Sequence, residues 1–310
     1  MALYFSYNQK TYSERQFNKQ LERVKSFGFD GLFFPVANAN TIGHSTKERK
    51  ILPFWNMIAQ AKSAGLKTGI KLQCFQNRVL YQNDSFTPPM NYLGVTYVPK
   101  SDYYPVCPNN PDGLKTFYNI TDLIANNTFL DFIYLEHFRF PFYWEKEELD
   151  IQNRIPPFCY CPFCVTEFSS VVGEIISTGE QIQSMMPEWL EWRTEVMFSL
   201  LSYIQEKVPN SVQIIVALPP LSLIDLPFTT GQLPQGLIEE GCFLSPQLHH
   251  KVKAKNLAWI EDLLDQYQLD LRIRRLIPSF EYGNAEEFEY LAKLEKKYSG
   301  IIFCPLPDAM

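Results

Sequence analysis

Short apolar segments alternate with longer amphipathic segments along nearly the whole chain. The apolar segments are rich in β-branched and aromatic residues, as in Asp30-Gly-Leu-Phe-Phe-Pro-Val36. Such nearly continuous apolar runs are typical of strands that are covered on both faces of a parallel sheet. The pattern predicts strands at 2–7, 30–36, 67–75, 131–138, 211–218, 241–248, 274–280 and 301–305.

The amphipathic segments have helical periodicity and, in several cases, start and stop signals. Ser13 is a plausible cap for the first, and Gly28 and Gly65 follow the first two. Helices are predicted at 13–27, 53–64, 110–126, 163–177, 187–207, 254–267 and 284–298.

Eight strands separated by helices predict an α/β fold with a parallel sheet, because each crossover is long enough for parallel pairing. A single closed (β/α)8 TIM barrel is favoured over an open doubly wound sheet. No glycine-rich phosphate loop follows the first strand, which argues against a dinucleotide-binding fold. We expect one domain over 1–310 that lacks the usual last helix, since the chain stops just after the eighth strand.

The composition and charge of the chain limit the kinds of molecule that it is expected to bind. The net charge of −6 argues against nucleic-acid binding, which usually needs an excess of positive charge. No apolar run is long enough to span a membrane, and the N-terminus lacks the features of a signal peptide. A cytoplasmic protein is therefore expected, with secretion open if a leader has been removed. Aromatic residues make up 15% of the chain, which fits core packing or sugar stacking. The oligomeric state stays open.

Glu136 and His137 lie near the end of the predicted strand at 131–138, and Arg139 follows directly after it. In barrel enzymes, catalytic side chains lie at the carboxyl ends of the strands. Upstream is Cys107-Pro-Asn-Asn-Pro111, and downstream is Cys159-Tyr-Cys161-Pro-Phe-Cys164.

These three segments resemble those of glycoside-hydrolase-like TIM-barrel proteins. The family pattern is approximately C-P-x-N-P, then D-G-I-H-L-D-Y-x-R-F/Y-P, then C-x-C-x-x-C. This chain departs from it with Glu136 in place of the strand-end Asp and with Phe132 near the strand start. The resemblance implies the barrel fold and a carbohydrate substrate. Two readings of the longer acid stay open: an altered carboxylate separation, or loss of the original chemistry.

Glycosidic hydrolysis needs two carboxylates that flank the scissile bond. Glu136 is the first candidate, and Glu281 follows the seventh predicted strand. Acids after strands four and seven match the layout of a large clan of retaining barrel glycosidases. By that analogy Glu136 is the acid/base and Glu281 the nucleophile, although a cation such as Arg139 beside Glu136 would suit the reverse. The alternatives are an ion pair of Glu136 with Arg139 or His137 and a surface position for Glu281.

Further candidates for substrate binding follow from the same positional argument. Arg139 would bind a substrate hydroxyl or carboxylate, or orient Glu136 through a forked pair. Polar residues at other predicted strand ends would line a pocket suited to sugar hydroxyls: Asn38, His44, Lys71, Gln73, Gln247 and His249. Tyr143 and Trp144 would form a stacking wall, whereas Tyr134 is expected in the core.

The cysteines suggest a separate site. Cys159, Cys161 and Cys164 lie close in sequence, and Cys107 is expected at the same end of the barrel. Four thiolates would form a closed structural zinc site, and a disulfide or packed thiols are the alternatives. Cys74, Cys242 and Cys304 lie in predicted strands and are expected in the core.

The sequence therefore predicts a glycoside hydrolase that needs no cofactor for catalysis and that acts through Glu136 and Glu281. The alternative is a catalytically inactive barrel that binds carbohydrate or serves as a scaffold.

Overall fold

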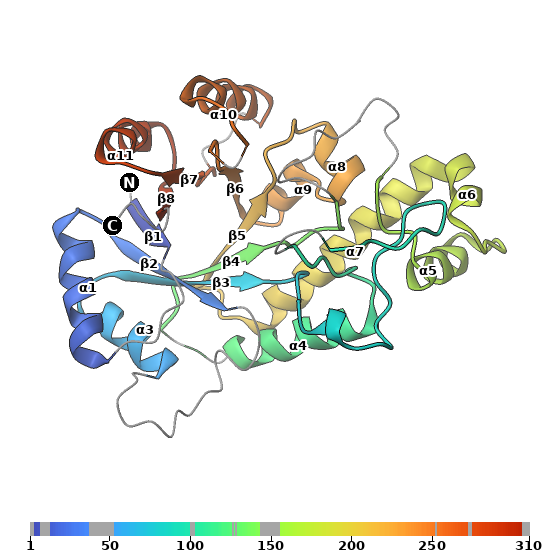
Figure 1. Cartoon of the computed structure of the whole chain (residues 1–310), viewed down its shortest axis with the longest axis horizontal. Helices are drawn as coiled ribbons and strands as arrows, with labels where there is room; N and C mark the ends of the chain where they lie inside the picture. The colour runs from blue at the N-terminus through green and yellow to red at the C-terminus, as the bar shows by residue number, and fades with distance from the viewer. Residues whose placement is uncertain are drawn as a thin grey trace.

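Eight parallel strands close into a barrel in chain order, with β8 pairing to β1 (Figure 1). They are β1 (Leu3–Ser6), β2 (Gly31–Val36), β3 (Lys67–Gln73), β4 (Phe132–Glu136), β5 (Gln213–Leu218), β6 (Phe243–Leu248), β7 (Ser279–Tyr282) and β8 (Ile301–Pro305). The computed structural model describes residues 3–6, 13–36, 53–99, 103–125, 127, 129–142, 156–251, 253–271 and 275–305. The predicted (β/α)8 barrel is confirmed.

Helices lie between the strands along the chain and pack around the barrel (Figure 1). They are α1 (Glu14–Ser26), α3 (Phe54–Ser63), α4 (Pro111–Ala125), α5 (Pro162–Val172), α6 (Gly179–Ile182), α7 (Met186–Lys207), α8 (Asp225–Thr230), α9 (Pro234–Glu239), α10 (Leu257–Leu271) and α11 (Ala285–Ala292). Short 3₁₀ turns occupy Leu80–Gln82, Gln183–Met185 and Lys293–Lys297. Ser13 caps α1 in a capping box with Gln16, as its sequence position suggests.

Two element boundaries differ from the prediction for clear backbone reasons. α5 ends at Val172, because Gly173 adopts a left-handed conformation with φ of 73°. β7 begins at Ser279, after Pro278, which has no N–H to donate to a neighbouring strand. The short helices α6, α8 and α9 were not predicted.

The barrel interior is filled by side chains from alternate strand positions. This interior cluster consists of Tyr4, Phe33, Phe132, Tyr134, Ile215, Ala217, Ile277 and Ile302. The rings of Tyr4 and Phe132 meet edge to face, with centroids 5.1 Å apart. Gly69 leaves room for the ring of Phe33, which belongs to the same cluster. A Cβ atom at position 69 would lie 2.5 Å from that ring.

We expect Gly69→Ala to destabilise the barrel by about 1–3 kcal/mol, because a fully packed interior cannot give way without moving Phe33. Urea denaturation followed by circular dichroism measures this loss. Asn56→Ala, on the exposed face of α3, is the control and should change the free energy of unfolding by less than about 0.5 kcal/mol. Equal stability of the Gly69 variant and the wild type would contradict the packing argument.

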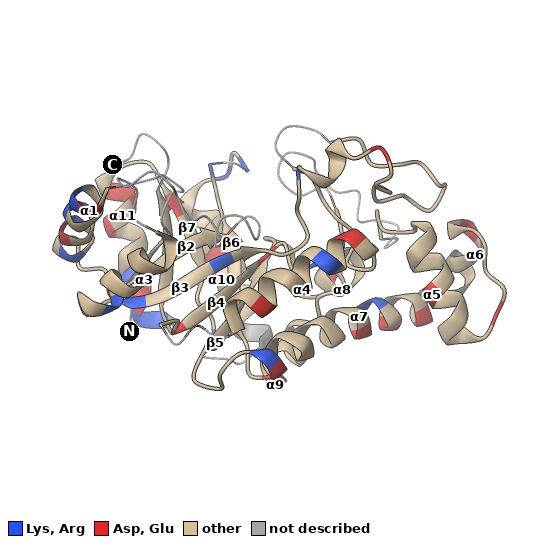
Figure 2. Ribbon diagram, turned by 90° about the horizontal axis from the view of Figure 1, so that it is seen from below, with Lys and Arg blue, Asp and Glu red and all other residues tan. Residues whose placement is uncertain are grey.

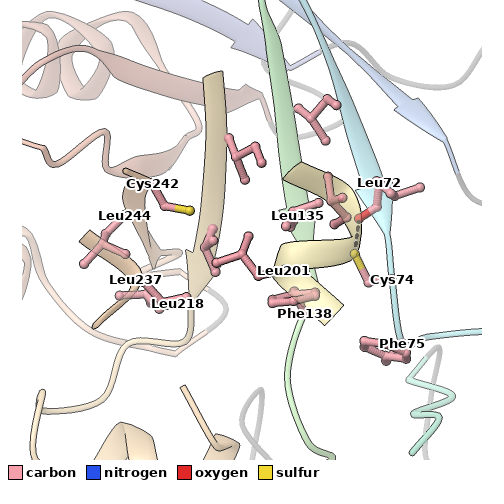
Figure 3. Close-up of a cluster of buried hydrophobic side chains, with 14 of the residues drawn as sticks. Leu72, Cys74, Phe75, Leu135, Phe138, Leu201, Leu218, Leu237, Cys242 and Leu244 are labelled. Carbon is pink, nitrogen blue, oxygen red and sulfur yellow. Dashed lines mark hydrogen bonds between the residues drawn. The ribbon is translucent and has the colours of Figure 1, made fainter. Parts of the chain in front are cut away.

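A second apolar core lies between the strands and the surrounding helices. Figure 3 shows part of it, in which leucines of β3, β4, β5 and β6 gather with Leu201 of α7 and Leu237 of α9. Cys74 and Cys242 are buried in this core, as the sequence predicts. The Cys74 thiol donates to the carbonyl of Leu72 at 3.4 Å.

α5 and α6 lie away from the strands, at the far end of the long helix α7 (Figures 1 and 2). Acidic residues are prominent on α7, which accounts for part of the net negative charge (Figure 2). Within the part of the chain that the structure describes, no helix is long and apolar enough to cross a membrane.

Candidate active site

A layer of polar side chains lies above the interior aromatic cluster, toward the carboxyl ends of the strands. Alternate residues of a strand face the same side. Because Tyr134 and Ile302 face the interior, Glu136 and Cys304, two residues further on, face it too. The same alternation places Ser279 and Glu281 inward from Ile277. Lys71, Gln247 and His249 complete the layer through their contacts with these residues.

Glu136 ends β4 and forms a salt bridge with Lys71 of β3, with 3.3 Å between Glu136 Oε1 and Lys71 Nζ. The side-chain amide of Gln247 donates to the same oxygen at 3.4 Å. Burial is the largest single influence and favours the neutral carboxyl, but the charge and hydrogen bond of Lys71 together with the charges of His137 and His249 outweigh it and lower the pKa of Glu136. Glu136 is therefore ionised at neutral pH, and its side chain remains 16% exposed.

Lys71 is held by more than its carboxylate partner. Burial disfavours the charged amine, but the charges of Cys304 and Glu136 raise the pKa of Lys71. The ammonium group also lies 5.0 Å from the centroid of the Tyr134 ring. Tyr134 itself is fully buried, so its predicted place in the core is confirmed.

Glu281 lies within β7 and is only 3% exposed. It is paired in register with Cys304 of β8, and its carboxylate accepts the backbone N–H of Lys251 from the loop after β6. The interpretation of Glu281 as a surface acid is therefore wrong. The residue sits in the interior because the strand continues to Tyr282 before the turn into α11 begins.

His249 is electrostatically connected to both acids. Burial lowers the pKa of His249, but a hydrogen bond with the Cys304 thiol and the charges of Cys304 and Glu281 raise it by more. The imidazolium in turn contributes to the low pKa of Glu136. The structure therefore places Glu136, His249 and Glu281 in one connected group.

His137 and Arg139 lie in the turn after β4, where His137 has a left-handed backbone with φ of 53°. Both are buried, and Arg139 Nη2 lies 3.2 Å from His137 Nδ1. Burial and the guanidinium of Arg139 lower the pKa of His137 to about 3, so the imidazole is neutral. The guanidinium also lies 4.9 Å from the centroid of the Phe142 ring. This turn therefore supplies a buried cation beside the end of β4.

Of the other predicted binding residues, one lies in the described part of the barrel and four do not. Gln73 is half-buried at the end of β3 and in register with Glu136. Asn38, His44, Tyr143 and Trp144 lie outside the described residues.

Sequence reasoning missed the role of Cys304, which was expected in the core. Six of the seven cysteines are buried, whereas Cys304 is half-exposed in the polar layer. Its Sγ lies 3.9 Å from Lys71 Nζ and 3.5 Å from the Ser279 hydroxyl. Cys304 does pack against the interior cluster, but its contact with the polar layer was not predicted, because it was classified by its apolar strand alone. Counting two residues on from the interior Ile302 would have placed it at the barrel mouth.

The four cysteines of the predicted metal site come together. The Sγ atoms of Cys107, Cys159, Cys161 and Cys164 all lie within 4.8 Å of one another, and all four residues are buried. The thiols of Cys107 and Cys164 are 3.2 Å apart, and those of Cys161 and Cys164 are 3.7 Å apart. Hydrogen bonds from the other three thiols lower the pKa of Cys161, as expected for one thiolate held by its neighbours.

Several solved structures of carbohydrate-cleaving enzymes share the fold of this chain. The PgaB glycoside hydrolase domain from Bordetella bronchiseptica matches with a TM-score of 0.66 and 11% identity, over 98% of this chain and 93% of that one. The catalytic domain of β-amylase from Paenibacillus polymyxa matches with a TM-score of 0.62 and 13% identity, over 98% and 92%.

A β-galactosidase from Marinomonas ef1 matches with a TM-score of 0.64 and 7% identity. The match covers 98% of this chain but 54% of that enzyme, so this chain spans about half its length. No family model and no curated protein matches the sequence. At these identities the likenesses show the TIM-barrel fold.

Proposed function

We propose that this protein is a glycoside hydrolase that cleaves a carbohydrate at the carboxyl end of the barrel. The observation that carries the proposal is the inward position of two acids, Glu136 on β4 and Glu281 on β7, both connected to His249. Glycosidic hydrolysis requires one carboxyl group that protonates the leaving oxygen and one that attacks the anomeric carbon or activates water. The glycoside hydrolase neighbours support a carbohydrate substrate.

The environment of Glu136 favours the ionised role. Lys71 holds its carboxylate charged, and a charged carboxylate serves as nucleophile or general base rather than as proton donor. Glu281 would then protonate the leaving group. This assignment exchanges the roles that the strand layout alone suggests.

The salt bridge leads to a pH prediction. Because Lys71 lowers the pKa of Glu136, replacing Lys71 with methionine in Lys71→Met should raise that pKa. A reaction that needs the ionised Glu136 is lost as the pH falls through this pKa. The acidic limb of the kcat/KM profile should therefore move to higher pH in the variant.

The matched control is Lys67→Met, which removes an exposed lysine at the opposite end of β3. Its pH profile should coincide with that of the wild type. An acidic limb that stays in place in the Lys71 variant would show that Glu136 is not the ionised catalytic group.

A carbohydrate-binding barrel without activity is the second candidate. It is favoured by the fact that both acids already have partners, Lys71 for Glu136 and the Lys251 amide for Glu281. A panel of 4-nitrophenyl glycosides and unmodified oligosaccharides separates the two functions. Turnover supports the hydrolase, whereas calorimetric binding of an oligosaccharide with no turnover supports the binding protein.

We also propose that Cys107, Cys159, Cys161 and Cys164 hold one structural zinc ion. Zinc–thiolate bonds of about 2.3 Å in a tetrahedron place sulfur atoms about 3.8 Å apart. The observed separations of 3.2 and 3.7 Å fit that set after small adjustments. Four thiolates leave no open position, so the ion would be structural. It would connect the segment before α4 to the start of α5.

A further inference from the structure

A thiol, an amine, an imidazole and a hydroxyl from four segments meet at the inner side of β8. Cys304 Sγ lies 3.9 Å from Lys71 Nζ of β3 and 3.5 Å from Ser279 Oγ of β7, and it shares a hydrogen bond with His249. Cys304 is also the one cysteine of the seven that retains partial exposure. The proposed hydrolytic mechanism assigns no role to the Cys304 thiol.

We propose that Cys304 is a reactive thiolate and a site of covalent modification at the barrel mouth, open to carbon electrophiles and to peroxides. The geometry meets both requirements of such a site. Two cationic partners, Lys71 and His249, stabilise a sulfur anion, and partial exposure admits a small reagent.

The charges around Cys304 act in opposite directions. Burial disfavours the thiolate, whereas Lys71, His249 and the Ser279 hydroxyl stabilise it. Glu281, the register partner of Cys304, and Glu136, which shares Lys71 as a partner, are the acids of the same layer. The stabilising groups prevail, and the pKa of Cys304 falls to about 6. The raised pKa of His249 is the matching change, since a thiolate and an imidazolium stabilise each other. Two tyrosines also lie within electrostatic range, Tyr134 and Tyr282, and stay neutral because burial raises their pKa values.

In both reactions the sulfur anion is the nucleophile in a simple displacement. With iodoacetamide, the thiolate forms a carbon–sulfur bond as the carbon–iodine bond breaks and iodide leaves. With hydrogen peroxide, a sulfur–oxygen bond forms as the oxygen–oxygen bond breaks, giving a sulfenic acid and hydroxide, which becomes water on protonation. Both reactions place new atoms next to Glu281, the register partner of Cys304. Lys71 interacts with the negative charges of both Cys304 and Glu136. Alkylation removes the charge of Cys304 and leaves Lys71 with Glu136 alone.

Site-resolved labelling of the full chain with iodoacetamide tests the proposal. Peptide mass spectrometry should show Cys304 alkylated first at pH 7, with a rate midpoint near pH 6. Lys71→Met should move that midpoint upward and slow labelling at pH 7 by about tenfold, because less thiolate is present. Lys67→Met is the control and should label like the wild type.

Two results would overturn the proposal. One is a Cys304 labelling rate no faster than that of a free cysteine peptide at pH 7. The other is a rate midpoint near 8.5 in both the wild type and the Lys71 variant. Cys304→Ser should remove the fast modification, and far-UV circular dichroism checks that both variants are folded. Because labelling is read from peptide mass, its outcome does not depend on whether the protein hydrolyses glycosides.

Discussion

Glu136→Gln is expected to lower kcat on aryl glycosides on the order of 10³-fold or more, the largest catalytic effect that we predict. The substitution keeps the size of the side chain and a hydrogen-bond acceptor for Lys71 and Gln247. It removes the negative charge that a nucleophile or a general base requires. Initial rates of 4-nitrophenol release, measured with the best substrate of the panel, give the ratio.

Two companion variants make the result specific. Glu281→Gln should also lose most activity, since one carboxylate alone cannot complete the reaction. Glu188→Gln, an exposed acid on α7 away from the barrel mouth, should retain full activity. Equal turnover by Glu136→Gln and the wild type would remove Glu136 from any catalytic role, even if the protein is a glycosidase.

The architecture was readable from sequence because parallel barrels repeat one simple unit. Each strand of this chain is covered on both faces, so the strands appear as apolar runs, and glycine marks several helix ends. Predictions failed where one residue changed the backbone. Gly173 ended α5 early, and Pro278 delayed β7. The short helices α8 and α9 span too few residues for periodicity to identify them.

The candidate site was readable only in part. Strand ends identified Glu136 and Glu281, because catalytic positions of a barrel follow from where its strands stop. The partner of Glu136 was harder to identify, since Lys71 lies 65 residues earlier and meets it only through the pairing of β3 with β4. Pairing registers depend on the stagger of the closed barrel, which a single sequence does not reveal. The place of Cys304 in the polar layer needed no register, only the alternation from Ile302 along its own strand.

Loss of the proposed zinc ion is expected to have the largest effect on stability. Cys161→Ser should reduce the zinc content from about one ion per chain toward zero and lower the Tm on the order of 10 °C. The physical reason is that the ion would bind four buried thiolates, offset part of their charge and join two segments that are distant in sequence. Elemental mass spectrometry of the purified protein and calorimetry measure the two quantities.

Cys242→Ala is the matched control, because it removes a buried thiol that lies in the outer core and away from the four-cysteine cluster (Figure 3). It should lower the Tm through lost packing while the zinc content stays at that of the wild type. If the wild type carries no metal after growth in zinc-supplemented medium, the four thiols are simply packed together. Cys161→Ser should then lower the Tm by no more than the core control does. The close approach of the four sulfur atoms is compatible with metal binding and with simple packing. The pair of variants distinguishes these two explanations.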